Sequence, residues 1–303
     1  MHILITGGTG LIGRRLCRYW LAQGHQLTVY SRQPERVAAL CGAPVRGIGT
    51  LAEYGAGPLH AVVNLAGAPI ADRPWTASRK ALLLASRVAL TAQLVSWLAN
   101  RAQRPEVLLS GSAVGWYGDG GEHVLTEDSP AGGADFAAQL CAAWGFEAQQ
   151  AQALGMRVVI VRTGLVLARE GGFLARLLTP FKLALGGPLG NGRQWMPWIH
   201  LHDQVALIDF LLRQRSLTGV FNASAPQPVR NADFTRALGQ VLRRPAVLRA
   251  PAWLLRLGLG QLAGLLLGGQ RALPERLLAS GFVFTFNDLP SALNDLLGPE
   301  DVA

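Results

Sequence analysis

Short apolar runs alternate with longer amphipathic stretches through the first half of the chain. The apolar runs predict buried strands at residues 2–6, 26–30, 61–65, 107–110 and 157–162. The stretches of helical periodicity predict helices at 11–23, 34–40, 78–101 and 135–153. Strands that are apolar throughout and separated by helices are typical of a parallel sheet covered on both faces. We therefore predict an α/β fold, a Rossmann-like doubly wound parallel sheet.

The second half of the chain has shorter elements and more turns. A glycine-rich loop fills 186–192, helices are predicted at 202–212, 233–242, 251–267, 274–279 and 289–297, and short strands at 220–222 and 282–286. Asp203 and Asn231 have side chains suited to capping a helix. We expect 1–164 plus 202–222 to form the sheet domain, and 165–201 plus 223–303 to form a smaller, mostly helical C-terminal domain. A cleft between two such parts is a favoured site for a small-molecule substrate.

Composition and charge narrow the class of protein. The 303 residues are 50% hydrophobic and 16% charged, which excludes a disordered chain. The net charge is +9, but the arginines are scattered and are not interleaved with aromatics, so we expect no nucleic-acid partner. The apolar stretch 253–267 is short and is interrupted by Arg256 and Gln261. We therefore expect no membrane, and a buried or interfacial amphipathic helix there.

The cysteines bear on metals and on the cellular compartment. Cys17, Cys41 and Cys141 are widely spaced and form no CxxC, which argues against a disulfide framework and against a zinc site. The first residues form a strand-like run without the basic and long apolar regions of a signal peptide. We therefore expect no metal, and a reducing, cytoplasmic setting.

A glycine-rich turn joins the first predicted strand to the first helix. It reads Thr6-Gly7-Gly8-Thr9-Gly10-Leu11-Ile12-Gly13. A tight turn needs a residue without Cβ, and a pyrophosphate needs close backbone approach and free N–H groups at a helix N-terminus. The GxxGxxG spacing follows a strand, precedes a helix and lies inside a βαβ unit, which is the context that supports a dinucleotide site.

The end of the second strand indicates which nicotinamide cofactor fits. An NAD site has an acid there for the ribose 2′-hydroxyl, whereas an arginine suits a 2′-phosphate. The chain reads Tyr30-Ser31-Arg32, with no acid before Glu35. Ser31 can donate a hydrogen bond and Arg32 a charge-assisted one, so we predict NADP(H).

Motifs along the rest of the chain complete a recognisable set. They are Asn64-Leu65-Ala66-Gly67, Ser86-Arg87, Ser110-Gly111-Ser112 through Tyr117-Gly118, Arg162-Thr163-Gly164, Gly186-Gly187-Pro188-Leu189-Gly190, Trp198-Ile199-His200 with Asp203, Asn222 through Pro226, and Gly269 through Pro274. With the glycine-rich turn, this set resembles the extended short-chain dehydrogenase/reductase superfamily. It is closer still to an atypical "epimerase family" branch of the NAD-dependent epimerase/dehydratase superfamily, which has its own C-terminal domain of unknown function. The resemblance covers essentially the whole chain.

The resemblance implies a set of cofactor-binding residues. They are Gly7, Gly10, Leu11, Ile12, Gly13, Ser31, Arg32, Leu65, Ala66 and Arg87. Family members bring a side chain toward the cofactor from the long helix, and Arg87 stands at that position. The alternative for Arg87 is a surface helix charge.

The superfamily's usual catalytic residues are incomplete in this chain. The resemblance gives Ser112 the role of the serine that polarises the substrate oxygen. The tyrosine general acid/base with a lysine four residues later is absent. The residues four beyond the four tyrosines are Gln23, Pro34, Pro58 and Gly121.

Substitutes for the missing pair remain open. We name Tyr117 as the candidate proton donor, with a packing aromatic as its alternative. Cys141 stands in the region of the missing lysine, where a buried small residue is the simpler interpretation. Glu127 and Asp128 are by default solvated loop charges.

The substrate side also departs from sugar-nucleotide enzymes. The arginine that holds the substrate diphosphate in those relatives is replaced by Met196, and Arg193 is the nearest substitute. Trp116, Trp195 and Trp198 are expected near the cleft, which suits an apolar or planar ligand.

Two functions follow. The first is an NADP(H)-binding oxidoreductase or epimerase-like enzyme of unknown substrate with a nonstandard active site. The alternative is a catalytically silent nucleotide-binding regulatory or scaffold protein, a class that fits the cell-division labels of some relatives. A homodimer is left open.

Overall fold

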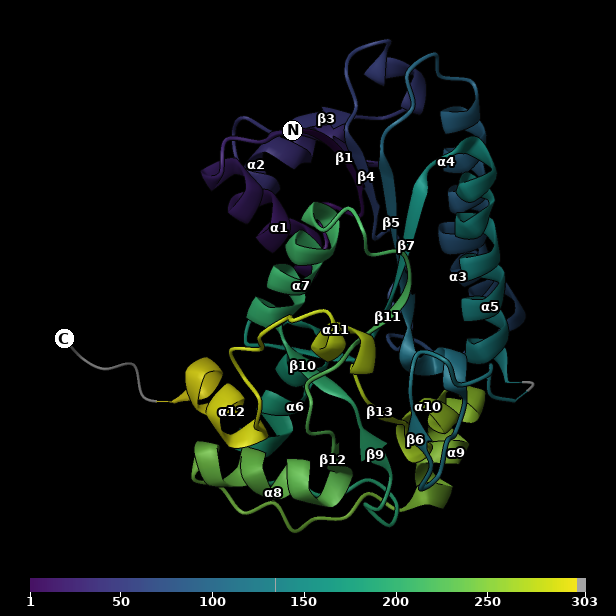
Figure 1. Ribbon diagram of the computed structural model, residues 1–303. Helices are drawn as coiled ribbons and strands as arrows, with labels where there is room; N and C mark the ends of the chain where they lie inside the picture. Colours follow the sequence, from purple (N-terminus) through teal and green to yellow (C-terminus); the bar gives the residue numbers. More distant parts are fainter. Residues whose placement is uncertain (134, 299–303) are drawn as a thin grey trace, which may run out of the picture.

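Seven parallel strands form the central sheet of the computed structural model, which describes residues 1–133 and 135–298 (Figure 1). Their order is β11-β7-β5-β4-β1-β2-β3. The strands are β1 (His2–Thr6), β2 (Gln26–Tyr30), β3 (Arg46–Ile48), β4 (Ala61–Asn64), β5 (Val107–Ala113), β7 (Arg157–Thr163) and β11 (Gly219–Ala223). The predicted Rossmann-like doubly wound sheet is confirmed. The short strand β3 carries too few apolar residues to be predicted from the sequence.

Helices cover both faces of this sheet (Figure 1). On one face lie α1 (Leu11–Ala22), α2 (Val37–Cys41) and α7 (Leu201–Arg213). On the other lie α3 (Ala77–Leu84), α4 (Leu90–Ala99) and α5 (Phe136–Gln149). The strands are apolar on both sides because each face is buried under helices.

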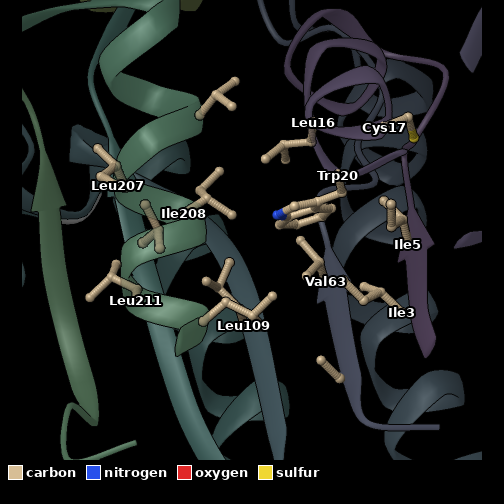
Figure 2. Packing of buried hydrophobic residues seen from close by; sticks show 14 of the residues in the cluster. Ile3, Ile5, Leu16, Cys17, Trp20, Val63, Leu109, Leu207, Ile208 and Leu211 are labelled. Carbon is tan, nitrogen blue, oxygen red and sulfur yellow. The ribbon is translucent and has the colours of Figure 1, made fainter. Parts of the chain in front are cut away.

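The core under α1 and α7 is centred on a tryptophan (Figure 2). Trp20 is fully buried among aliphatic side chains of both helices and of the strands. Its indole Nε1 donates a hydrogen bond to Asp209 Oδ1 at 2.7 Å. The bond ties α1 to α7, so residues far apart in the sequence are joined in one core.

The predicted helix 78–101 is interrupted by a π-helical turn at Ala85–Ala89, between α3 and α4. A π turn inside a helix is frequently found at a functional site, and this one carries Arg87. The combined helix, Ala77–Ala99, is long and apolar enough by composition to cross a membrane. Its C-terminal half packs against α5 and the sheet through Thr91, Leu94 and Leu98, and 28% of its most apolar window is buried.

The C-terminal part is smaller and mostly helical. Its helices are α6 (Gly172–Lys182), α8 (Asn231–Leu242), α9 (Ala252–Leu259), α10 (Ala263–Leu267), α11 (Glu275–Ala279) and α12 (Leu289–Leu297). Two-strand pairings join β8 (Leu165–Ala168) to β10 (Trp198–His200), β9 (Trp195–Met196) to β12 (Val229–Arg230), and β6 (Val124–Leu125) to β13 (Arg271–Ala272). A second core around Phe181, Trp198 and Phe234 holds it together.

Several local predictions were wrong. Residues 282–286 form no strand: Phe282 and Phe284 are buried in alternation, but the N–H groups of Thr285 and Phe286 donate to the Asp203 carboxylate, at 2.9 Å each. Asp203 is therefore not the cap of α7. The cap is His200, whose Nδ1 accepts from the N–H of residue 202 at 3.0 Å.

Asn231 also differs from its predicted capping role. It is the first residue of α8, and its Oδ1 accepts from the Leu189 N–H at 2.8 Å. The predicted helix 251–267 is divided at Gly260, which has a φ of +55°. A tertiary contact outweighed the local pattern at Asn231, whereas the break at Gly260 is local, because glycine readily adopts a positive φ.

Candidate functional site

The glycine-rich turn leads from β1 into α1 and is fixed by close backbone contacts. Gly7 has a φ of +72°, and a Cβ on it would lie 2.6 Å from the carbonyl carbon of Leu65. A Cβ on Gly13 would lie 2.4 Å from the Gly7 carbonyl oxygen. Gly10 precedes α1 and provides no side-chain cap. The first N–H groups of α1, Leu11 to Gly13, are therefore open to an anionic ligand.

A buried polar network places the neighbouring strand end against this turn. The Thr6 hydroxyl donates to Asn64 Oδ1 at 2.6 Å and accepts from the Ala66 N–H at 3.2 Å. Asn64 Nδ2 donates in turn to the Thr91 hydroxyl at 2.8 Å. The network holds Leu65 and Ala66 beside Gly7, which brings these predicted cofactor residues together.

Ser31 and Arg32 lie at the carboxyl end of β2. The Ser31 N–H donates to the Ile48 carbonyl at 3.0 Å, and its hydroxyl accepts from the Gln33 N–H at 3.1 Å. Arg32 is exposed and has no hydrogen bond or ion pair with the residues that the structure describes. Its guanidinium is free to reach a phosphate.

Arg87 projects from the π turn toward the same edge of the sheet. Its Nη2 donates to the Ala68 carbonyl at 2.9 Å, and its guanidinium carbon lies 5.4 Å from the centre of the Trp144 ring. A Cβ on Gly67 would lie 2.7 Å from that carbon. Burial lowers the pKa of Arg87. No carboxylate within 1–133 or 135–298 pairs with this partly buried cation, so an anion from outside the chain would neutralise its charge.

Ser112 lies within β5 and not after it, opposite Arg162 of β7. It is 6% exposed, and the Cys141 thiol of α5 lies close enough to Ser112 for the two side chains to influence each other. Burial raises the pKa of Cys141, so its sulfur is a neutral thiol and not a base.

Small residues fill the place of the missing Tyr–Lys pair. Ala137 and Cys141 stand on α5 at that four-residue spacing. A Cβ on Gly115 would lie 3.4 Å from the Ala137 Cβ and 3.8 Å from the Cys141 sulfur. The helix therefore packs directly against the turn that follows β5.

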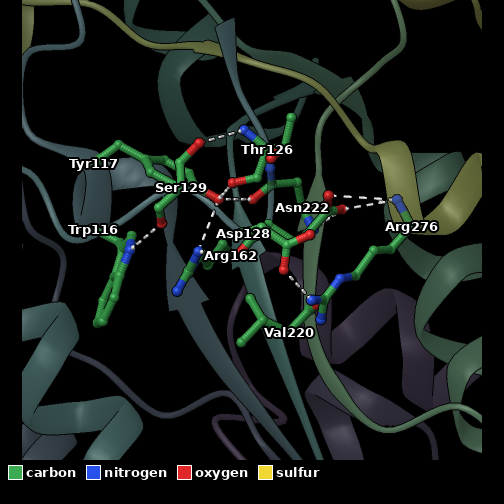
Figure 3. A network of polar contacts seen from close by, with 10 residues as sticks. Trp116, Tyr117, Thr126, Asp128, Ser129, Arg162, Val220, Asn222 and Arg276 are labelled. Atoms are coloured by element: carbon green, nitrogen blue, oxygen red, sulfur yellow. Dashed lines mark hydrogen bonds and ion pairs between the residues drawn. The ribbon is translucent and has the colours of Figure 1, made fainter.

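Tyr117 lies inside a buried polar network (Figure 3). Its hydroxyl lies 2.7 Å from Asn222 Oδ1 and 2.8 Å from the Thr126 carbonyl, and it accepts from Arg162 Nη1 at 2.9 Å. The side chain is 2% exposed, and burial raises its pKa. The hydroxyl is fully engaged with protein groups, so the catalytic role of Tyr117 stays a prediction.

Glu127 belongs to the same network and is not a solvated loop charge. Its Oε1 accepts from the Asn222 N–H at 3.0 Å, and its carboxylate lies 3.4 Å from the Arg276 N–H. Burial raises the pKa of Glu127. Asp128, in contrast, is exposed and ion-paired with the Arg276 guanidinium. The network ties the sheet to the C-terminal part.

A cavity of about 300 Å³ separates the turn after β5 from α9 and α10. It is lined by Trp75, Gly115, Gly118, Asp119, Asp135, Ala137, Arg256, Gln261, Gly264, Leu265, Leu267, Gly268 and Gln270. Ala137 of α5, the helix in which the usual tyrosine and lysine are absent, therefore faces the cavity.

The tryptophans expected near the cleft lie elsewhere. Trp198 is fully buried in the C-terminal core, Trp195 stacks on Arg230, and Trp116 stacks on Arg162. Trp75 lines the cavity instead. Trp75 lies in the segment between β4 and α3, where no hydrophobic periodicity indicates which side chains face a cavity.

No group of three or more His, Cys, Asp or Glu side chains suited to a metal ion occurs in the described part of the chain.

Comparisons with known proteins agree with this architecture. The model of the NAD-dependent epimerase/dehydratase family matches residues 3–224, and that of a domain of unknown function, DUF1731, matches residues 250–296. Epimerase family protein YfhF of Bacillus subtilis (strain 168) is 34% identical over 299 residues, which cover 98% of each chain. Epimerase family protein SDR39U1 of Mus musculus is 36% identical over 301 residues, covering 98% of this chain and 100% of that one.

A solved structure extends the likeness to three dimensions. The crystal structure of human epimerase family protein SDR39U1 (isoform 2) with NADPH superposes with a TM-score of 0.90 at 34% identity. The match covers 99% of this chain and 100% of that one. The resemblance predicted from the motifs is thus confirmed, and the chain belongs to the NAD-dependent epimerase/dehydratase family, in the epimerase-family branch that ends in a DUF1731 domain.

Proposed function

We propose that this chain binds NADP(H) at the turn between β1 and α1. The observation that carries the proposal is a pair of cations without carboxylate partners, Arg32 and Arg87, on either side of the open N-terminus of α1. Arg32 is suited to the 2′-phosphate, and no acid stands at that strand end to select NAD. The human relative solved with NADPH supports the same cofactor.

The residues near Ser112 are suited to holding a carbonyl or hydroxyl oxygen. When bound, the nicotinamide supplies or accepts a hydride. The Ser112 hydroxyl would donate to the substrate oxygen, and the neutral Cys141 thiol nearby would not compete for the proton. With Ala137 at the cavity wall and Tyr117 engaged elsewhere, water in the cavity is the simplest proton donor. We propose an NADP(H)-dependent oxidoreductase or epimerase-like enzyme on this basis.

The cavity lining bears on the substrate class. Arg256 is its one cation among the described residues, whereas Asp119 and Asp135 are acidic. Neither Arg193 nor Met196 lines it, so the usual diphosphate-binding position contributes nothing there. A small, planar or apolar substrate therefore suits the cavity better than a second diphosphate. A thermal-shift screen with NADP present checks this, and strong stabilisation by sugar nucleotides would contradict it.

The cofactor proposal is tested by titration calorimetry with NADPH and NADH. Wild-type protein should prefer NADPH, and Arg32→Ser should reduce that preference about tenfold or more because it removes a charge-assisted hydrogen bond. The neighbouring Arg36→Ser is the matched control, since Arg36 bonds to Gln33. Equal affinity of wild-type protein for both cofactors would refute the assignment.

A second candidate function is a nucleotide-binding regulatory or scaffold protein without turnover. It is favoured by the place of Tyr117 in a structural network and by the absence of tyrosine and lysine from α5. A panel of carbonyl compounds distinguishes the two. An enzyme oxidises NADPH with at least one compound and loses that activity in Ser112→Ala, whereas a scaffold binds NADPH tightly and oxidises it with none.

We also propose a cytoplasmic location. It is supported by three cysteines that are all buried and unpaired, as expected in a reducing compartment.

A further inference from the structure

Seven large apolar side chains are exposed at the end of the C-terminal part that carries α9. They are Leu183, Leu185, Val247, Leu248, Trp253, Leu254 and Leu257, here called the apolar tip. Leu257 is 78% exposed and Trp253 is 67% exposed. Trp253, Leu254 and Leu257 follow i, i+1, i+4 spacing, so they share one face of α9. A gathering of this kind marks an interaction surface.

Three segments meet to form the tip. The Leu248 N–H donates to the Gly186 carbonyl at 3.1 Å, and the Ala250 N–H donates to the Pro188 carbonyl at 2.9 Å. The segment 244–250 therefore lies beside 182–190, and it leads directly into α9. In Figure 1 this segment runs along the lower edge of the molecule, below α8, to reach α9. The backbone segments that carry the apolar tip are thus joined to one another along this edge of the molecule.

Unpaired cations surround the tip. Lys182, Arg243, Arg244, Arg249 and Arg256 are all exposed, and none pairs with a carboxylate among residues 1–133 and 135–298. The sequence explains this, because it has no acidic residue between Glu170 and Asp203 or between Asp233 and Glu275. The surface therefore combines Trp and Leu side chains with positive charge alone.

We propose that the apolar tip docks on an anionic lipid surface, with α9 lying in the headgroup region. Trp and Leu on one side and Arg and Lys around them are the features of a helix that lies in a membrane interface. The cytoplasmic leaflet carries the complementary negative charge. This inference revises the sequence-based expectation of no membrane: the chain lies on the bilayer at the tip and does not cross it there.

Other occupants fit less well. A second copy meeting through the same tip would place these arginines against one another. A nucleic acid would match the charge but would offer its phosphates, and no apolar surface, to Trp253 and Leu257. An anionic lipid surface offers an apolar environment to Trp253 and Leu257 and negative charge to the surrounding arginines.

Vesicle co-sedimentation of the full chain tests the proposal. Vesicles of phosphatidylcholine mixed with phosphatidylglycerol should bind the protein, pure phosphatidylcholine should bind it much less, and salt should weaken the binding. Trp253→Gln with Leu257→Gln should lower the bound fraction about tenfold, because two apolar side chains leave the interface. Arg243→Gln with Arg249→Gln should lower it on anionic vesicles alone.

Val283→Ser is the matched control, since Val283 is 83% exposed outside the tip. It should bind vesicles as wild-type protein does. Unchanged melting temperature and NADPH affinity in each variant show that the fold is intact. Three outcomes overturn the proposal: no vesicle binding, binding that the α9 variants retain in full, or a concentration-dependent dimer in sedimentation that Leu257→Gln abolishes.

Discussion

The two sides of the candidate site are built in different ways. On the cofactor side, the turn has no room for a Cβ at Gly7 or Gly13, where one would lie within 3 Å of backbone atoms, and Arg32 and Arg87 lack carboxylate partners among the described residues. On the reaction side, Tyr117 and Glu127 already have hydrogen-bond partners within the protein. The cofactor side is thus incomplete without an anion, whereas the reaction side is satisfied as it stands.

This difference separates binding from chemistry. A site that needs a ligand to satisfy its charge is prepared for that ligand. Catalytic side chains that are hydrogen-bonded to protein groups must give up those hydrogen bonds before they act on substrate. Substitutions on the cofactor side should therefore lower the affinity for NADPH. Substitutions on the reaction side should first lower the free energy of unfolding.

The largest effect is expected from Gly7→Ala. The added Cβ would lie 2.6 Å from Leu65 and would force a positive φ on alanine. Because the turn must shift, NADPH affinity should fall about 100-fold, as measured by titration calorimetry. Gly24→Ala is the control: Gly24 also has a positive φ, but its Cβ would meet nothing within 4 Å. Equal losses in both variants would mean that the turn is not the cofactor site.

Tyr117→Phe should mainly reduce stability. Removing the hydroxyl leaves Arg162 and Asn222 each short of a buried partner. The free energy of unfolding should fall by about 1–3 kcal/mol in urea titrations. NADPH affinity should stay within about twofold of wild type, because the network lies on the reaction side. A large loss of turnover with unchanged stability would instead make Tyr117 catalytic.

Arg87→Gln should lower NADPH affinity without lowering stability, which is the opposite of the effect expected for Tyr117→Phe. NADPH affinity should fall about tenfold, since a charge-assisted contact is lost. The melting temperature without cofactor should stay the same or rise, because a partly buried cation without a carboxylate partner is removed. Lys80→Gln, on the same helix, is the control. A clear drop in stability with full NADPH affinity would show that Arg87 serves the fold alone.

Sequence alone predicts the cofactor side well because the requirement lies in the backbone. Gly7, Gly10 and Gly13 follow a strand and precede a helix, and that order needs no tertiary knowledge. The reaction side depends on contacts between distant segments. Tyr117 meets Asn222 of β11, and the Asp203 carboxylate is engaged by residues 285 and 286. Local propensity contains no information on such pairs.

Glu127→Gln should have the smallest effect, seen only as a change in pH dependence. Burial raises the pKa of Glu127 in the folded chain. A carboxyl of this kind stabilises the fold below its unfolded pKa, near 4.3, and that contribution is lost as pH rises through the folded pKa. In wild-type protein, therefore, stability should decline over this range relative to Glu127→Gln, whose amide keeps an oxygen to accept from the Asn222 N–H. Urea unfolding across pH measures the difference in slope, with exposed Glu170→Gln as the control. Parallel profiles for wild type and Glu127→Gln would mean that the pKa of Glu127 is the same in the folded and the unfolded chain. The burial of Glu127 would then have no effect on the pH dependence of stability.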